Sequence, residues 1–226
     1  MAASDRPVLK NFLAMTELPS VLVSLVHLSV SVARNDWGGA DVALRDLDSS
    51  SCEPVVVDEA ILQLCLFVGY PATLTTAELW RGISGAEPTD LDTGRPSTLD
   101  AWNARGEELC REIYGTAYEQ LRSNVAAIHP ALDRWMIMEG YGKVLGRPGL
   151  DLGDRELCII GVLAAGGWKQ QLHSHLRGAL RCGVPYEWVE QALEIGLEHA
   201  EPTLADELRE LWANVRISNK GDSHVH

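Results

Sequence analysis

The sequence predicts an all-helical protein. Apolar residues recur mostly at three- and four-residue spacing, which is the period of one helix face. Alternating strand patterns are scarce, and β-branched residues are not clustered into hairpins. These observations predict helices at residues 20–34, 39–47, 56–69, 72–83, 98–122, 129–146, 153–166, 169–182, 186–199 and 202–217.

The first apolar run, Leu18 to Val32, contains a proline, several serines and a histidine. It is too short and too polar to span a bilayer, so we expect a buried helix. The preceding stretch, MAASDRPVLK, does not have the pattern of a signal peptide. We therefore expect a cytoplasmic protein.

The clearest linker is SGAEPTDLDTGRPST, residues 84–98, which holds two prolines and two glycines. It separates a front part from a longer back part. We assign residues 1–86 to a front helical unit, 87–98 to the linker, 99–217 to the main helical domain and 218–226 to a polar, disordered tail.

Composition excludes several classes of partner. The formal net charge is -13, whereas a protein that binds nucleic acid needs a basic face for the phosphates. The same charge disfavours anionic membrane surfaces. We expect neither nucleic acid nor membrane as a partner.

Five cysteines are widely spaced, and no CxxC occurs. This pattern is typical of neither a secreted disulfide framework nor a zinc site. Reduced, mostly buried thiols are the expected state.

A weak internal repeat crosses the linker. At an offset of 131–132 residues, Trp37 matches Trp168, Leu44-Arg45 matches Leu176-Arg177, and Val57–Ile61 matches Val189–Leu193. The chain then consists of two tandem, degenerate copies of one helical unit. The front copy has Ala43 where the back copy has His175, so one copy lacks the chemistry of the other.

The segment Arg155 to Gly183 is the richest in chemistry. Asp154 is a plausible N-cap for an apolar helix that ends at Gly166-Gly167, after which a second helix begins. On that helix His175 shares a face with leucines and alanines, whereas His173 points to the opposite side. Two histidines on opposite faces make a poor metal pair, so we expect no metal.

In an antiparallel hairpin, Glu156 lies near the level of His175, where a carboxylate can hold and tune an imidazole as a general acid or base. The alternative is structural: Glu156 pairs with Arg177 or caps its helix, and His175 is a core histidine.

These residues carry a family resemblance. The hairpin resembles the carboxymuconolactone decarboxylase family in the pattern REL, a run of small apolar residues, then G, QL, HLRGAL and GV. Two further segments resemble the same family: HPALDRWMIMEGYGKVLGRPGLDL upstream of the hairpin and DEAILQLCLFVGYPATLTTAEL in the front part. The similarity covers most of residues 55–215 and assigns the 99–217 domain to this family. It implies an alkylhydroperoxidase D-like helical fold.

The family has two chemical branches. Alkylhydroperoxidase D-like members carry a Glu, a CxxC and a His in this hairpin, but here Trp168 and Gln171 occupy the cysteine positions. A thiol peroxidase needs a reactive thiolate and a resolving thiol, so the resemblance points away from that activity. A residual redox role for Cys158 or Cys182 remains a minor alternative.

The decarboxylase branch keeps the Glu and the His. The resemblance implies a cofactor-free lyase of aromatic-compound catabolism, in which protonated His175 polarises the lactone or delivers a proton and Glu156 orients the imidazole. Arg177 or Lys143 would hold the substrate carboxylate, and Tyr141 and Trp168 would line the pocket. Structural alternatives are an Arg177–Glu156 ion pair and a helix end at Tyr141 and Lys143. The competing function is a non-catalytic ligand-binding or assembly protein on the same scaffold.

The resemblance also implies rings of helical units, so a fused double unit would form a homotrimer in place of a hexamer. The apolar helices at 20–34 and 56–69 exceed what the short front part can bury alone, which fits an interface.

Overall fold

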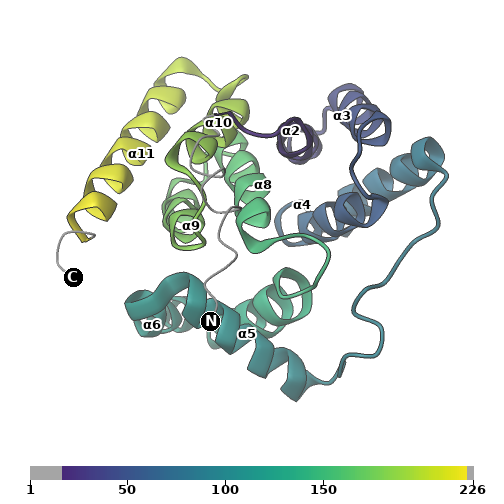
Figure 1. The fold of residues 1–226 in the computed structure, drawn as a ribbon. Coiled ribbons are helices and arrows are strands. Elements are labelled where there is room, and N and C mark those ends of the chain that lie inside the picture. The colour runs from purple at the N-terminus through teal and green to yellow at the C-terminus, as the bar shows by residue number, and fades with distance from the viewer. Residues whose placement is uncertain (1–16, 223–226) are drawn as a thin grey trace, which may run out of the picture.

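The computed structural model describes residues 17–222, and within this range it contains helices and no strand, which confirms the all-α prediction. The helices, in chain order, are α2 (Ser20–Ala33), α3 (Trp37–Ser49), α4 (Pro54–Ser84), α5 (Leu99–Tyr114), α6 (Tyr118–Ile128), α7 (Pro130–Trp135), α8 (Leu152–Ala165), α9 (Lys169–Arg181), α10 (Tyr186–Leu197) and α11 (Pro202–Asp222). A 3-10 turn, η1 (Gly115–Ala117), and a π-helix, η2 (Met136–Leu145), complete the chain (Figure 1).

Most helix ends fall close to the predicted positions, and the differences have local causes. The expected helix at 98–122 is broken at Gly115, where a positive φ of 53°, which favours glycine, ends α5. Helix α4 runs through both expected helices, but Gly69 inside it has a φ of 77°, so the predicted break is present. Helix α8 begins at Leu152, which puts Asp154 in its first turn instead of at the N-cap.

The internal repeat is present as two matching sets of three helices. Helices α8, α9 and α10 begin 132 residues after α2, α3 and α4: at Leu152 against Ser20, at Lys169 against Trp37, and at Tyr186 against Pro54. The leucine and valine matches keep this register. The tryptophan match is wrong by one position, because Trp168 lies opposite Asp36, each directly before its helix.

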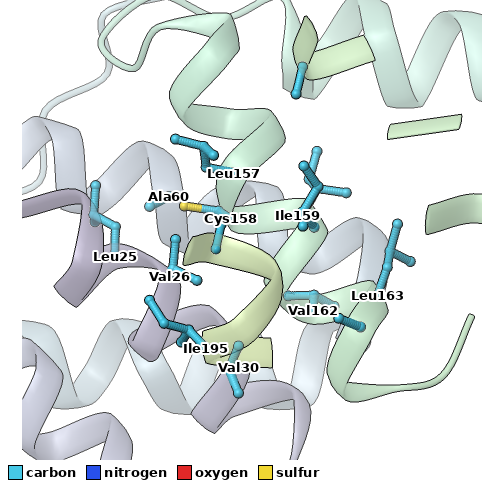
Figure 2. Close-up of a cluster of buried hydrophobic side chains, with 14 of the residues drawn as sticks. Leu25, Val26, Val30, Ala60, Leu157, Cys158, Ile159, Val162, Leu163 and Ile195 are labelled. Atoms are coloured by element: carbon cyan, nitrogen blue, oxygen red, sulfur yellow. The ribbon is translucent and has the colours of Figure 1, made fainter. Parts of the chain in front are cut away.

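The two sets pack on each other through α2 and α8, which are neighbours in Figure 1. Figure 2 shows Val26 and Val30 of α2 beside Leu157, Cys158 and other apolar residues of α8. Gly161 permits this approach, since a Cβ there would lie 2.8 Å from Val26 Cγ1. Front and back helices therefore share one hydrophobic core, and each contributes apolar area that the other needs to bury.

Buried ion pairs reinforce this contact. Arg155 of α8 and Glu59 of α4 are both fully buried, and their side chains are bonded at 3.0 Å. Arg147, which follows η2, donates to the same carboxylate at 3.0 Å. Since removal of one partner would leave a buried charge unpaired, these groups fix α4 against the back part.

The segment between α4 and α5 contains no helix but is bound to the back part. Asp90 accepts from Arg147 at 2.7 Å, and Asp92 accepts from Arg105 at 3.1 Å. The predicted linker is therefore docked against the back part.

Helix α4 is the one helix within residues 17–222 with the length and hydropathy of a membrane span, with a mean hydropathy of 1.5. It carries the buried Asp58 and Glu59, breaks at Gly69 and packs on α2 and α3. Buried carboxylates held by arginines are typical of a core helix in a folded domain.

Two sequence predictions concern the chain ends. Helix α11 continues to Asp222, so residues 218–222 are helical and the expectation of disorder there is wrong. Residues 223–226 lie outside the described residues, and so does the N-terminal stretch MAASDRPVLK, which was compared with the pattern of a signal peptide.

Candidate active site

Glu156 and His175 are hydrogen bonded across the α8–α9 hairpin. His175 Nδ1 lies 2.8 Å from Glu156 Oε2. The carboxylate is fully buried, and the imidazole side chain is 12% exposed. Because the bond uses Nδ1, Nε2 is the ring nitrogen left for a ligand.

A glycine makes room for this carboxylate. A Cβ at Gly178 of α9 would lie 3.3 Å from Glu156 Oε2 and 3.1 Å from Ile113 Cγ2. Glu156 Oε1 is also buried, and no group in the described part of the chain bonds it. A buried acceptor without a hydrogen-bond partner lowers the stability of the folded protein. Such destabilising groups are typical of functional sites.

The alternative in which Glu156 forms an ion pair with Arg177 is not observed in the described part of the chain. The Glu156 bond goes to His175, and no ion pair to Arg177 is present within residues 17–222. Arg177 instead lies near His173, whose pKa is lowered by burial and by that positive charge.

His175 lines a cavity of about 390 Å³ between α4, α5, α6, η2 and α9. The titratable groups on its wall are His175, Tyr114 and Tyr141; among the described residues, no Asp, Glu, Lys or Arg side chain lines it. The remaining wall consists of apolar side chains, a glycine, a serine and side-chain amides. This composition is typical of a site for a small, largely apolar molecule with a few polar atoms.

Two tyrosines on this wall form a pair. The Tyr141 hydroxyl donates to the Tyr114 hydroxyl at 3.0 Å, and the rings meet edge to face with centroids 6.1 Å apart. Burial raises the pKa of both phenols well above the usual value, and the negative charge of Glu156 raises both further. Both groups are therefore neutral hydrogen-bond donors at physiological pH, and Tyr114 keeps its own proton for a ligand.

The π-helix η2 places Tyr141 on this wall. Helices α5 and η2 approach so closely that a Cβ at Gly142 would lie 1.9 Å from the Trp102 carbonyl oxygen. A Cβ at Gly106 would lie 2.0 Å from the Ile137 carbonyl oxygen. π-Helical turns are rare and frequently occur at functional sites.

Tyr114 and Phe67 are site residues that the sequence analysis missed. Phe67 of α4 lies edge to face with the His175 ring, at a centroid distance of 6.2 Å. Tyr114 is held by its backbone, since Arg181 of α9 donates to its carbonyl oxygen at 2.7 Å. No local spacing relates Tyr114 to the site, because its hydrogen-bond partner Tyr141 is 27 residues away.

Three other predicted residues are not on the cavity wall. Lys143 pairs with Glu139 at 3.2 Å and lies over the Trp102 ring. Trp168 is 60% exposed, and Arg177 is likewise absent from the wall. Of the two positions that hold cysteines in peroxidases, only Gln171 faces the cavity.

Three of the cysteines, including Cys158 and Cys182, are unsuited to redox chemistry. All five are free, and burial raises the pKa of Cys110, Cys158 and Cys182 to about 12 in each case. Figure 2 shows the Cys158 sulfur among apolar side chains. Thiols with such pKa values are protonated and poorly nucleophilic at neutral pH. Among residues 17–222, no three His, Cys, Asp or Glu side chains are placed to hold a metal ion.

Comparison with known proteins places this hairpin in a family. Residues 117–213 match the model of the carboxymuconolactone decarboxylase family. The matched range includes Tyr141, Glu156 and His175, whereas Tyr114 and Phe67 lie before it. No curated protein matches the chain.

Proposed function

Because residues 117–213 form a carboxymuconolactone decarboxylase family domain, we propose that this protein is a cofactor-free acid–base enzyme that decarboxylates a small carboxylated lactone. The observation that supports the proposal most directly is the 2.8 Å bond between Glu156 and His175 at the wall of a cavity. A carboxylate on Nδ1 fixes the tautomer and the orientation of the imidazole.

The reaction assigns a role to each polar group. The bond between the ring carbon and the carboxylate carbon breaks, carbon dioxide leaves, and the electron pair moves through a double bond into the lactone carbonyl. Imidazolium at His175 then gives its Nε2 proton to carbon. The Tyr114 hydroxyl, itself accepting from Tyr141, donates to the lactone oxygen as negative charge develops there.

The uncharged wall favours the loss of carbon dioxide. No arginine or lysine of the described chain lines the cavity, so apolar side chains and uncharged polar groups make up most of the surroundings of the substrate carboxylate. A localised carboxylate is poorly stabilised in such surroundings, whereas the delocalised charge of the transition state loses less solvation. This arrangement replaces the carboxylate-binding role first expected of Arg177 and Lys143.

Turnover on carboxylated muconolactones tests the proposal. Purified protein should release carbon dioxide and consume the lactone, and His175→Ala of unchanged helical content should not. The competing function, a non-catalytic ligand-binding protein, predicts saturable binding in the cavity without turnover. A folded wild-type protein inactive on every related lactone would overturn the enzyme proposal.

We also propose that the chain forms a homo-oligomer, with a trimer of double units as the expected state. Leu62 and Leu66 form an exposed apolar face of α4 before its break at Gly69, and Tyr70 and Leu74 are exposed after the break. Leu66 also lines the His175 cavity, so a second copy on this face would shield the cavity from water. Light scattering that shows a monomer would contradict this.

The five free cysteines support a reducing, cytoplasmic location.

A further inference from the structure

The front repeat has a cavity of its own, of about 330 Å³, between α2, α3 and the end of α10. It occupies the position that corresponds to the His175 cavity. Five residues on its wall stand 132 positions from residues on the other wall; these pairs are Gly39 and Gln171, Val42 and Ser174, Ala43 and His175, Glu198 and Leu66, and His199 and Phe67. The two cavities are therefore products of the same repeat.

The front cavity cannot perform the chemistry of the back one. In the register of the repeat, Ala43 replaces His175 and Ser24 replaces Glu156, so the hydrogen-bonded pair is missing. The helix scaffold around the cavity is nevertheless kept, which leaves a hollow lined by other side chains.

The charge of the wall is also different. Asp36, Asp46 and Glu198 bring three carboxylates to the front cavity, against the single guanidinium of Arg34. Two imidazoles, His27 and His199, complete the polar wall, with His27 Nε2 3.9 Å from Glu198 Oε1. The three carboxylates outnumber the one guanidinium, and an excess of negative charge of this kind attracts cations.

A serine hydroxyl on the cavity wall points to a ligand independently of these charges. Ser31 is 9% exposed and lines the cavity, and no described group bonds its hydroxyl. A Cβ at Gly39 would lie 2.7 Å from Ser31 Oγ, so the glycine keeps the space in front of the hydroxyl open. A hydroxyl without a protein partner on the wall of a cavity can bond a ligand atom in place of water.

We propose that the front cavity binds a small organic cation, an ammonium group attached to an apolar body. The carboxylates of Glu198 and Asp46 would bind the ammonium group, and the Ser31 hydroxyl would accept one of its hydrogens. Val30, Val42 and Ala43 would contact the apolar body. A metal ion is a poorer fit, since no metal-holding cluster is present within residues 17–222.

Calorimetric titration of the full chain with phenethylamine tests this, with 2-phenylethanol as a probe of similar shape that lacks the charge. We expect saturable binding of the amine and affinity at least about tenfold lower for the alcohol. The double variant Asp46→Asn/Glu198→Gln should lose at least about tenfold in amine affinity. Asp48→Asn, a surface carboxylate on α3 outside the cavity, is the matched control and should bind as the wild type does.

His175→Ala separates the two cavities. Amine binding that survives His175→Ala and disappears in the double variant supports the front site, whether or not the protein decarboxylates lactones. Equal binding of amine and alcohol, or amine binding that the double variant keeps, would overturn the proposal. So would amine binding that His175→Ala removes, because the ligand would then occupy the back cavity.

Discussion

His175 Nδ1 lies 2.8 Å from Glu156 Oε2, which joins the second helix of the α8–α9 hairpin to the fully buried carboxylate of the first. The contact leaves Nε2 for the cavity and sets the tautomer of the imidazole. The rate of turnover should therefore respond to changes at either residue.

Replacement of His175 by alanine should abolish proton delivery. We expect turnover to fall by about 10² to 10⁴, the range that positioned acid–base groups contribute. Carbon dioxide release under saturating lactone measures the effect. His173→Ala is the matched control, because His173 is exposed and does not line the cavity. If His173→Ala impaired turnover as strongly as His175→Ala, the assignment of His175 would be wrong.

Glu156→Gln should act through His175. The amide keeps the shape of the carboxylate but removes the negative charge that orients the imidazole through Nδ1, so turnover should fall. Carbon dioxide release under saturating lactone measures the fall. In combination with His175→Ala, Glu156→Gln should add little further loss, since the two residues act as one unit. Additive losses would show that Glu156 has a separate role.

The tyrosine pair predicts an ordered set of effects. Tyr114→Phe removes the donor that faces the ligand, and we expect turnover to fall by about 10². Tyr141→Phe removes only the hydroxyl that donates to Tyr114 at 3.0 Å, so turnover should fall by less than in Tyr114→Phe. Comparison of kcat and KM for both variants is the measurement. A larger effect from Tyr141→Phe would reverse the roles assigned to the two hydroxyls.

Gly142→Ala should destabilise the protein, because its Cβ would lie 1.9 Å from the Trp102 carbonyl oxygen. Overpacking of this kind costs about 1–3 kcal/mol or more. Gly140→Ala is the control on the same π-helix, since a Cβ added there would have no described atom within 4 Å. Urea unfolding of the two variants should separate them clearly. Equal stability would mean that α5 and η2 do not approach as described.

Asp154 should make stability depend on pH. Burial, and then the nearby charge of Asp151, raise the pKa of Asp154 from its ordinary value of 3.8 to about 6. A carboxyl with a raised pKa in the folded state contributes most below the unfolded pKa, and the contribution is lost as pH rises through about 6. Asp154→Asn should therefore stabilise the protein at about pH 8, by about 1 kcal/mol after allowance for its partial exposure.

Urea midpoints at about pH 5 and about pH 8 test this, because the advantage of Asp154→Asn should shrink at the lower pH. The competing effect is the helix dipole, which favours a carboxylate in the first turn of α8. A variant less stable than the wild type at the higher pH would show that the dipole outweighs burial.

The sequence alone determined the helices and the repeat, because both depend on local patterns. The three- and four-residue spacing of apolar residues predicted nearly every helix, including the break at Gly69. The offset between the two copies followed from leucine and valine matches that the structure keeps. The pairing of Glu156 with His175 also followed from helix periodicity, since an antiparallel hairpin with a short turn fixes which residues lie level.

Only the tertiary structure decided what surrounds that pair. Tyr114 and Phe67 reach the cavity from α5 and α4, and no local spacing relates them to His175. Arg177 and Lys143 were expected there because they are close to the motif in sequence, but helix direction and ion pairing take them elsewhere. Long-range packing thus set the charge of both cavities, since whether a side chain reaches a wall depends on helices that are distant in the chain.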